Sequence, residues 1–170
     1  MKICVTGGIA CGKSLLASIL RAEGIPVIDA DDVAHEFLPD PAERRRIARE
    51  VFADPAKRRE LEACLHPLIR EKLDAFDGVH IIPLLFELHW EAKYDIICTV
   101  ISEKAVQLDR MTRLRGYSPE EALARLAAQL PPEYKAARSQ YVIRNDGSLA
   151  EFRAAAEKLV RELKEKMQHG

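Results

Sequence analysis

The chain of 170 residues lacks long apolar runs, repeats, low-complexity stretches and any strong excess of charge of one sign. No run approaches the length of a membrane span, and an apolar run starts two residues after Met1, so we expect neither a membrane helix nor a secretory leader. The formal net charge of -1 gives no bulk attraction to nucleic acid or to an anionic membrane. We therefore expect one soluble, cytoplasmic domain over residues 1–170, a length that supports a single well-formed core.

Cysteines are also few, and their spacing is uninformative. Cys4, Cys11, Cys64 and Cys98 show neither C-x-x-C spacing nor a Cys/His ligand pattern, which argues against a disulfide framework or a zinc site. We expect them to be reduced and mostly buried. Cys11 is the expected exception, because a following helix N-terminus and Lys13 predict a lowered thiol pKa and a raised reactivity.

The strongest feature present is the segment 7–14, which reads G-G-I-A-C-G-K-S and matches the phosphate-loop pattern G-x-x-x-x-G-K-[ST]. In such a loop the backbone N–H groups point at phosphate oxygens, the lysine (Lys13) reaches the β- and γ-phosphates, and the hydroxyl of Ser14 ligates Mg²⁺. A strand-like run precedes the segment and a helix-forming run follows it, so the helix N-terminus also faces the phosphates. A plain glycine-rich turn is the alternative interpretation.

Acidic residues follow the next short strand, 25–28. Because ligands of open α/β sheets bind beyond the carboxyl ends of the strands, these carboxylates are candidates for the site. Asp31 is our candidate for the base, or for the group that orients an acceptor hydroxyl, and Asp29 for holding Mg²⁺ directly or through its water shell. Asp29 and Asp31 are also explained as solvated turn residues or as N-caps of the following helix, and Asp32 is more simply the N-cap.

The pattern along the rest of the chain alternates between strands and helices. Apolar runs at 78–85, 94–101 and 141–143 predict strands, and residues 33–77 and 148–167 predict helices. Expected helix starts are Asp40-Pro41, Asp54-Pro55, Ser118-Pro119 and the capping box Ser148-x-x-Glu151. A buried stripe is expected on the last helix at Phe152, Ala156, Leu159, Val160, Leu163 and Met167. This order predicts an α/β fold of three layers around a central, mostly parallel sheet.

A basic segment, 110–140, is predicted to be a helical lid. Its arginines suit the stabilisation of a transferring phosphoryl group, and we select Arg110, Arg113 and Arg138, although an exposed charged helix face explains such residues equally well. Glu87, after the 78–85 strand, is either a second carboxylate of the site or a helix-terminal acid. His66, which precedes Pro67, indicates a helix boundary more than a metal ligand.

Taken together, short motifs in order along the whole chain resemble the dephospho-CoA kinases. They are Thr6 to Ser14, Val27-Ile28-Asp29-Ala30-Asp31, Leu65-His66-Pro67, Pro83 to Glu87, Arg110-x-x-Arg113, Arg125-x-x-x-Gln129 and Val142-Ile143-x-Asn145-x-Gly147. The resemblance implies the P-loop NTPase fold, with 33–77 as the acceptor-binding region. It also implies transfer of phosphate from ATP, with Mg²⁺, to the 3′-hydroxyl of dephospho-CoA, the last step of coenzyme A biosynthesis.

The resemblance also implies roles for individual residues. The ATP-binding loop would be Gly7, Gly8, Ile9, Ala10, Cys11, Gly12, Lys13 and Ser14, followed by Leu15. Asn145 and Gly147 would lie by the adenine, Asp31 beside the acceptor hydroxyl, His66 and Glu87 in the substrate region, and Arg113 and Arg138 in the lid.

The sequence departs from the family pattern at Ala10, Cys11, Leu15 and Gln140, where the family usually has glycine, serine, threonine and aspartate. The segment between Leu38 and Arg46 is also shorter than the family's helical acceptor-binding region. These departures leave two alternatives open: a related kinase for another hydroxyl acceptor, such as a nucleoside or small acid, and an ATP-binding regulator without catalysis.

Overall fold

The computed structural model describes residues 1–38 and 40–169. The chain divides into two compact units, one formed by Met1–Val27 with Gly78–Gly170 and the other by Ile28–Asp77. The first unit carries most of the sheet, and the second carries three helices. Within the described residues, no helix is both long enough and apolar enough to cross a membrane.

Five strands form one sheet in the order β2-β3-β1-β4-β5. Their bounds are β1 Ile3–Gly7, β2 Val27–Asp29, β3 Val79–Ile81, β4 Ile96–Ile101 and β5 Tyr141–Arg144. β1 pairs in parallel with β3 and β4, and β4 pairs in parallel with β5. β1 and β4 are buried along their whole length, as expected for parallel strands covered on both faces. The predicted parallel sheet is confirmed.

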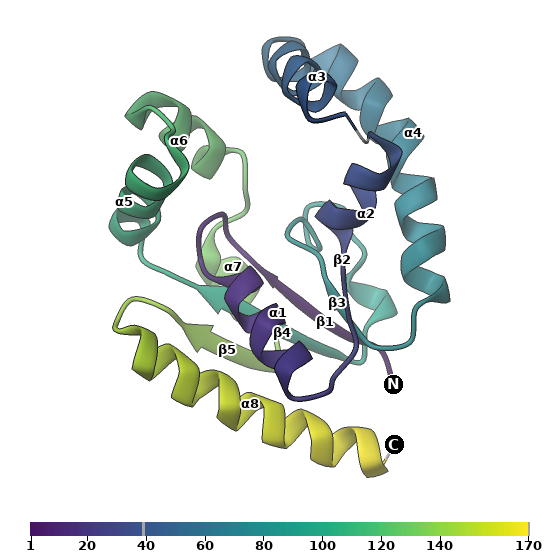
Figure 1. Cartoon of the computed structure of the whole chain (residues 1–170), viewed down its shortest axis with the longest axis vertical. Helices are drawn as coiled ribbons and strands as arrows, with labels where there is room; N and C mark the ends of the chain where they lie inside the picture. The colour runs from purple at the N-terminus through teal and green to yellow at the C-terminus, as the bar shows by residue number, and fades with distance from the viewer. Residues whose placement is uncertain (39, 170) are drawn as a thin grey trace. The chain divides into compact units, whose positions relative to one another are not determined.

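Helices α1 (Lys13–Ala22) and α8 (Leu149–His169) lie side by side on one face of the sheet (Figure 1). Between them and the strands lies the main core, to which α8 contributes the predicted stripe from Phe152 to Leu163. Met167, expected in this stripe, is instead 42% exposed, because it lies in the last turns of α8, beyond the part of the helix that packs on the core. The short η1 (Glu91–Lys93) precedes β4, and α7 (Pro132–Ala136) packs against β4.

The segment 110–140, predicted to be a lid, contains most of α5 (Lys104–Arg115), all of α6 (Pro119–Ala127) and the short α7, and α5 and α6 pack together as a hairpin. Gly116 ends α5 at φ 69°, a left-handed conformation that glycine adopts without steric cost. The predicted capping box is present, because Ser118 and Glu121 each bond the other's backbone N–H. α6 ends at Ala127.

The second unit holds α2 (Ala30–Phe37), α3 (Pro41–Ala53) and α4 (Pro55–Ala75), with α4 packed against the other two. The predicted caps are confirmed, since Asp40 accepts from the N–H of Ala42 and Asp54 accepts from the N–H of Ala56. The side chains of Val51 and Phe52, expected on an apolar face, lie outside the described residues.

Two details of this unit correct the predictions. The cap of α2 is Asp29, whose carboxylate accepts from the N–H of Asp31 at 2.9 Å, and not Asp32, which lies within the first turn. The predicted helix boundary at His66-Pro67 is also wrong, because α4 continues through Pro67 to Ala75. Packing against α2 and α3 outweighs the hydrogen bond that an internal proline removes.

Candidate functional site

The loop between β1 and α1 is the centre of the candidate site. Gly12 has φ 104° and carries no side chain, and a Cβ at this position would overlap the amide of Asn145. The next residue, Lys13, starts α1, so the free N–H groups and the positive end of the helix dipole open onto the loop. This is the geometry of an anion site for phosphate groups.

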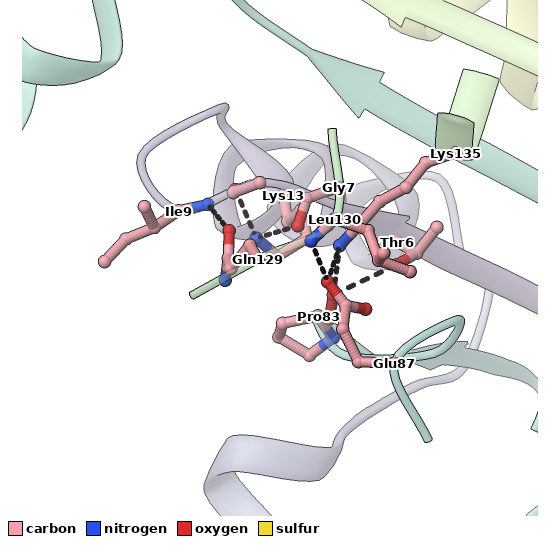
Figure 2. Close-up of polar contacts among 10 residues, drawn as sticks. Thr6, Gly7, Ile9, Lys13, Pro83, Glu87, Gln129, Leu130 and Lys135 are labelled. Carbon is pink, nitrogen blue, oxygen red and sulfur yellow. Dashed lines mark hydrogen bonds and ion pairs between the residues drawn. The ribbon is translucent and has the colours of Figure 1, made fainter. Parts of the chain in front are cut away.

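Lys13 lies across the loop. Its ammonium donates to the carbonyl of Gly7 at 3.0 Å and to that of Gly8 at 2.7 Å (Figure 2). Ser14 follows on the first turn with an exposed side chain, and Leu15 packs partly buried against the main core. A hollow of about 140 Å³ is lined by Lys13, Ser14 and Arg110, among others. Cation, hydroxyl and helix N-terminus thus converge where the sequence predicts.

Three consecutive carbonyls of the loop accept hydrogen bonds from side chains outside it. The donors are Gln107 to Ile9 at 2.7 Å, Arg110 to Ala10 at 3.2 Å and Asn145 to Cys11 at 2.8 Å. Arg110 also donates to the carbonyl of Asn145 at 2.8 Å and to the hydroxyl of Ser102 at 3.1 Å. The loop is therefore bracketed from outside by α5 and by the turn after β5.

This bracket adds to the predicted roles of two residues. Arg110 was selected as a lid arginine and Asn145 as a neighbour of adenine, and both hold loop carbonyls. Gln107 carried no signal in the sequence: a glutamine within a polar helix resembles a surface residue, yet it is only 3% exposed. Only the fold shows that it faces the loop.

Ala10 has φ 59°, in the left-handed region that costs a residue with a Cβ about 1–3 kcal/mol. The family usually has glycine at this position, and the structure places Ala10 in a conformation that is costly for a residue with a Cβ. Its side chain is 9% exposed and packs with Met111 and Ala122 of the lid. Contacts on both sides of the residue thus support the strained conformation.

Cys11 corrects a prediction. The thiol is fully buried, and burial raises its pKa above the ordinary value, while the charge of Lys13 lowers it by less. The prediction of a lowered thiol pKa at Cys11 is therefore wrong, because the loss of hydration raises the pKa by more than the nearby cation lowers it. Cys4 and Cys98 are buried as predicted, whereas Cys64 is exposed.

A buried ion pair joins the loop after β3 to the predicted lid segment. Lys135 is 1% exposed, and its ammonium lies 2.8 Å from the Glu87 carboxylate and donates to the carbonyl of Pro83 at 3.1 Å (Figure 2). Glu87 also accepts from the N–H of Leu130 at 3.0 Å through the same oxygen, Oε1. Thr6 of β1 donates to Pro83 as well, at 3.2 Å. Glu87 is thus tied to the C-terminal end of the lid, and its contact with substrate stays a prediction.

Other predicted residues lie in exposed or local settings. Arg113 pairs with Asp109 one turn earlier on α5 at 3.3 Å and is exposed, and Arg138 stacks on the ring of Tyr134 at 3.6 Å. Gly147 lies in the turn before α8, where a Cβ would overlap the carboxylate of Glu151. These positions are compatible with the proposed roles but do not test them.

Asp31 and His66, two of the predicted acceptor residues, and Asp29, the predicted Mg²⁺ ligand, lie in the second unit. One carboxylate oxygen of Asp29 caps α2, and Asp31 lies on the first turn of that helix with an exposed side chain. His66 lies within α4, on the turn that includes Pro67. Their roles toward the acceptor remain predictions.

The parallel sheet, the phosphate loop after its central strand and the basic helical lid define a P-loop kinase. The sequence model of a family described as dephospho-CoA kinase matches residues 1–43 and 40–151. A dephospho-CoA kinase of Anaeromyxobacter dehalogenans is 37% identical, over 94% of this chain and 90% of that protein. The chain therefore belongs to the dephospho-CoA kinase family.

Solved structures share the fold of this chain. A Thermus thermophilus crystal structure superposes with a TM-score of 0.78 at 35% identity, over 96% of this chain and 97% of that one. A shikimate kinase from Bacteroides thetaiotaomicron has a TM-score of 0.66 at 19% identity, covering 96% and 98% of the two chains. At that identity the second likeness shows the shared fold alone.

Proposed function

We propose that the chain is a dephospho-CoA kinase, which transfers the γ-phosphoryl group of ATP to the 3′-hydroxyl of the dephospho-CoA ribose and releases coenzyme A and ADP. The observation that carries the proposal is the phosphate loop with Lys13 fixed across it, in a chain of this family. Phosphoryl transfer needs little covalent chemistry from a protein, so positioning and charge stabilisation are the functions to assign.

The loop and lid residues divide these functions between them. Lys13 and the N–H groups at the start of α1 would bind the β- and γ-phosphates and stabilise charge that develops during transfer. Arg113 and Arg138 of the lid segment would add positive charge around the transferring group. Asn145 and Gly147, in the turn after β5, would border the adenine.

The residues present fit Mg²⁺ that enters with the nucleotide. Mg²⁺ usually keeps several waters and binds one or two protein oxygens together with substrate phosphates. Ser14 exposes a hydroxyl beside Lys13, and the described residues contain no group of three or more acidic, His or Cys side chains that would form a separate cage. Ser14 and Asp29 would hold the ion, which neutralises charge on the β- and γ-phosphates when bound.

The acceptor would be bound by the helical region 33–77, with Asp31 accepting or orienting the proton of the 3′-hydroxyl and with His66 and Glu87 in the substrate region. The two matches to the family model overlap at residues 40–43, which lie in the shortened segment between Leu38 and Arg46. The alignment with the Anaeromyxobacter relative spans 191 positions, more than the 170 residues of this chain, so the relative carries residues that this chain lacks. We therefore expect the shortening to affect the KM for dephospho-CoA more than that for ATP.

The test is ADP release from Mg-ATP with dephospho-CoA, adenosine or shikimate as acceptor, and chromatographic identification of coenzyme A as the product. Lys13→Ala is the matched inactive control. Stimulation by dephospho-CoA alone, lost in this variant, is the expected result. Stimulation by shikimate or adenosine instead would reassign the acceptor, and ATP binding without turnover on any of the three would overturn the proposal.

A further inference from the structure

We infer that Gln107 is a positioning residue for the nucleotide, acting through the peptide that joins Ile9 to Ala10. This inference rests on the proposed use of ATP but not on the identity of the acceptor. Gln107 lies in the first turn of α5, and its side-chain amide donates to the carbonyl of Ile9 at 2.7 Å.

The shape of the loop is fitted to this contact. A Cβ at Gly8 would lie 2.6 Å from the side-chain nitrogen of Gln107, so any larger residue at position 8 would displace the amide. Gln107 is 3% exposed, and a buried amide placed against a carbonyl stabilises one orientation of that carbonyl. Gly8 and Gln107 therefore act as one unit.

The direction of the Ile9 carbonyl sets the direction of the Ala10 N–H. The peptide bonds among the described residues are trans, and in a trans peptide the C=O and the next N–H point opposite ways. Gln107 thus turns the N–H of Ala10 away from itself. Since N–H groups of this loop bind phosphate in the proposed function, Gln107 presets one of these donors before nucleotide arrives.

The strained conformation of Ala10 explains why such a support is needed. At φ 59° the residue would relax to a right-handed or extended conformation unless the neighbouring peptides were held. Gln107 holds the carbonyl before Ala10, and Arg110 holds the carbonyl of Ala10 itself at 3.2 Å. Loss of the first support leaves the strain opposed only by the second and by packing with the lid.

The lid segment also reaches the preceding peptide, which joins Gly8 to Ile9. Gln129, which follows α6, accepts from the N–H of Ile9 at 3.0 Å (Figure 2). Gln107 and Gln129 thus bond the C=O and the N–H of one residue from the two ends of the lid hairpin. Movement of the lid is therefore transmitted to Ile9, and Gln107 is the end of this connection next to Ala10.

The experiment replaces Gln107 with Met, which has a similar length and no N–H donor, and measures Mg-ATP affinity by calorimetry together with both KM values. Loss of one hydrogen bond of average strength predicts an ATP affinity weaker by about fivefold. The KM for dephospho-CoA should stay within about twofold of the original value. Gln168→Met, on the exposed end of α8, is the matched control and should change nothing.

Rescue by glycine tests the route of action. Ala10→Gly removes the left-handed strain, so the loss of ATP affinity caused by Gln107→Met should be smaller when position 10 is glycine. An equal loss in both backgrounds, or unchanged ATP affinity in a folded Gln107→Met variant, would overturn the inference. A parallel rise in both KM values would mean that the residue only supports the fold.

A second variant is available if Gln107→Met fails to fold. Gln107 borders a cavity of about 460 Å³, so the shorter side chain of Gln107→Ala enlarges a hollow that already exists.

The ATP-binding measurement keeps this inference separate from the proposed function, because calorimetry with Mg-ATP requires no acceptor. If the original chain binds ATP without phosphorylating dephospho-CoA, the proposed function fails while weaker ATP binding in the variants still supports the role of Gln107.

Discussion

Replacement of Lys135 by Met should be among the most destabilising single changes in the chain. The lysine is 1% exposed and lies 2.8 Å from Glu87, so its loss leaves a carboxylate with little water and no counter-ion. Removal of one partner from a buried ion pair costs about 3–5 kcal/mol. Because Leu130 still donates to Glu87, we expect the lower end, about 3 kcal/mol, or a fall in Tm of roughly 6–12 °C for a chain of this size.

The assay is urea unfolding followed by far-UV circular dichroism and by fluorescence of Trp90, the one tryptophan in the sequence. A double variant, Glu87→Gln with Lys135→Met, removes both charges and keeps an acceptor for Leu130, so most of the lost stability should return. Lys158→Met breaks an exposed pair with Glu162 and should cost less than about 0.5 kcal/mol. A loss below about 1 kcal/mol in Lys135→Met, or a double variant as unstable as the sum of the single ones, would refute the reasoning.

Lys13→Ala should lower kcat by about 10²- to 10³-fold with an unchanged melting curve, since the lysine acts on developing charge, and near-normal turnover would contradict the loop assignment. Iodoacetamide at pH 8 should label exposed Cys64 and spare Cys11, whose pKa is raised by burial, until guanidinium unfolds the chain; peptide mass spectrometry that finds Cys11 labelled in the native protein would count against its burial. Ser118→Ala should destabilise the start of α6 by about 1 kcal/mol and speed amide hydrogen exchange there, and unchanged exchange would mean that the capping box with Glu121 contributes little.

Features that depend on neighbours in sequence were predictable. The phosphate loop needs only the order of residues 7–14, and the caps at Asp40, Asp54 and Ser118 need a side chain and a proline beside it. The apolar runs were sufficient for the parallel sheet, because strands buried on both faces are apolar throughout. These signals are local, and the structure confirms them.

Features that depend on distant contacts were not predictable. Glu87 and Lys135 are 48 positions apart, and nothing near either residue in sequence indicates the other. The wrong pKa direction for Cys11 has a similar origin: the cation is local and visible in sequence, whereas the burial that outweighs it is made by the fold. At Pro67 the local rule predicts a boundary, and packing of α4 overrides it.

The small core of the lid has a consequence for the exchange of parts between relatives. Met111 and Ala122 are closed off by Ile9 and Ala10, which belong to the nucleotide loop and not to the hairpin. A lid taken from a kinase with glycine at position 10 would meet a methyl group for which it was not shaped, and this lid on such a kinase would leave a gap. Chimeric enzymes should therefore exchange the loop and the hairpin as one cassette, and substitutions in the two segments should be inherited together.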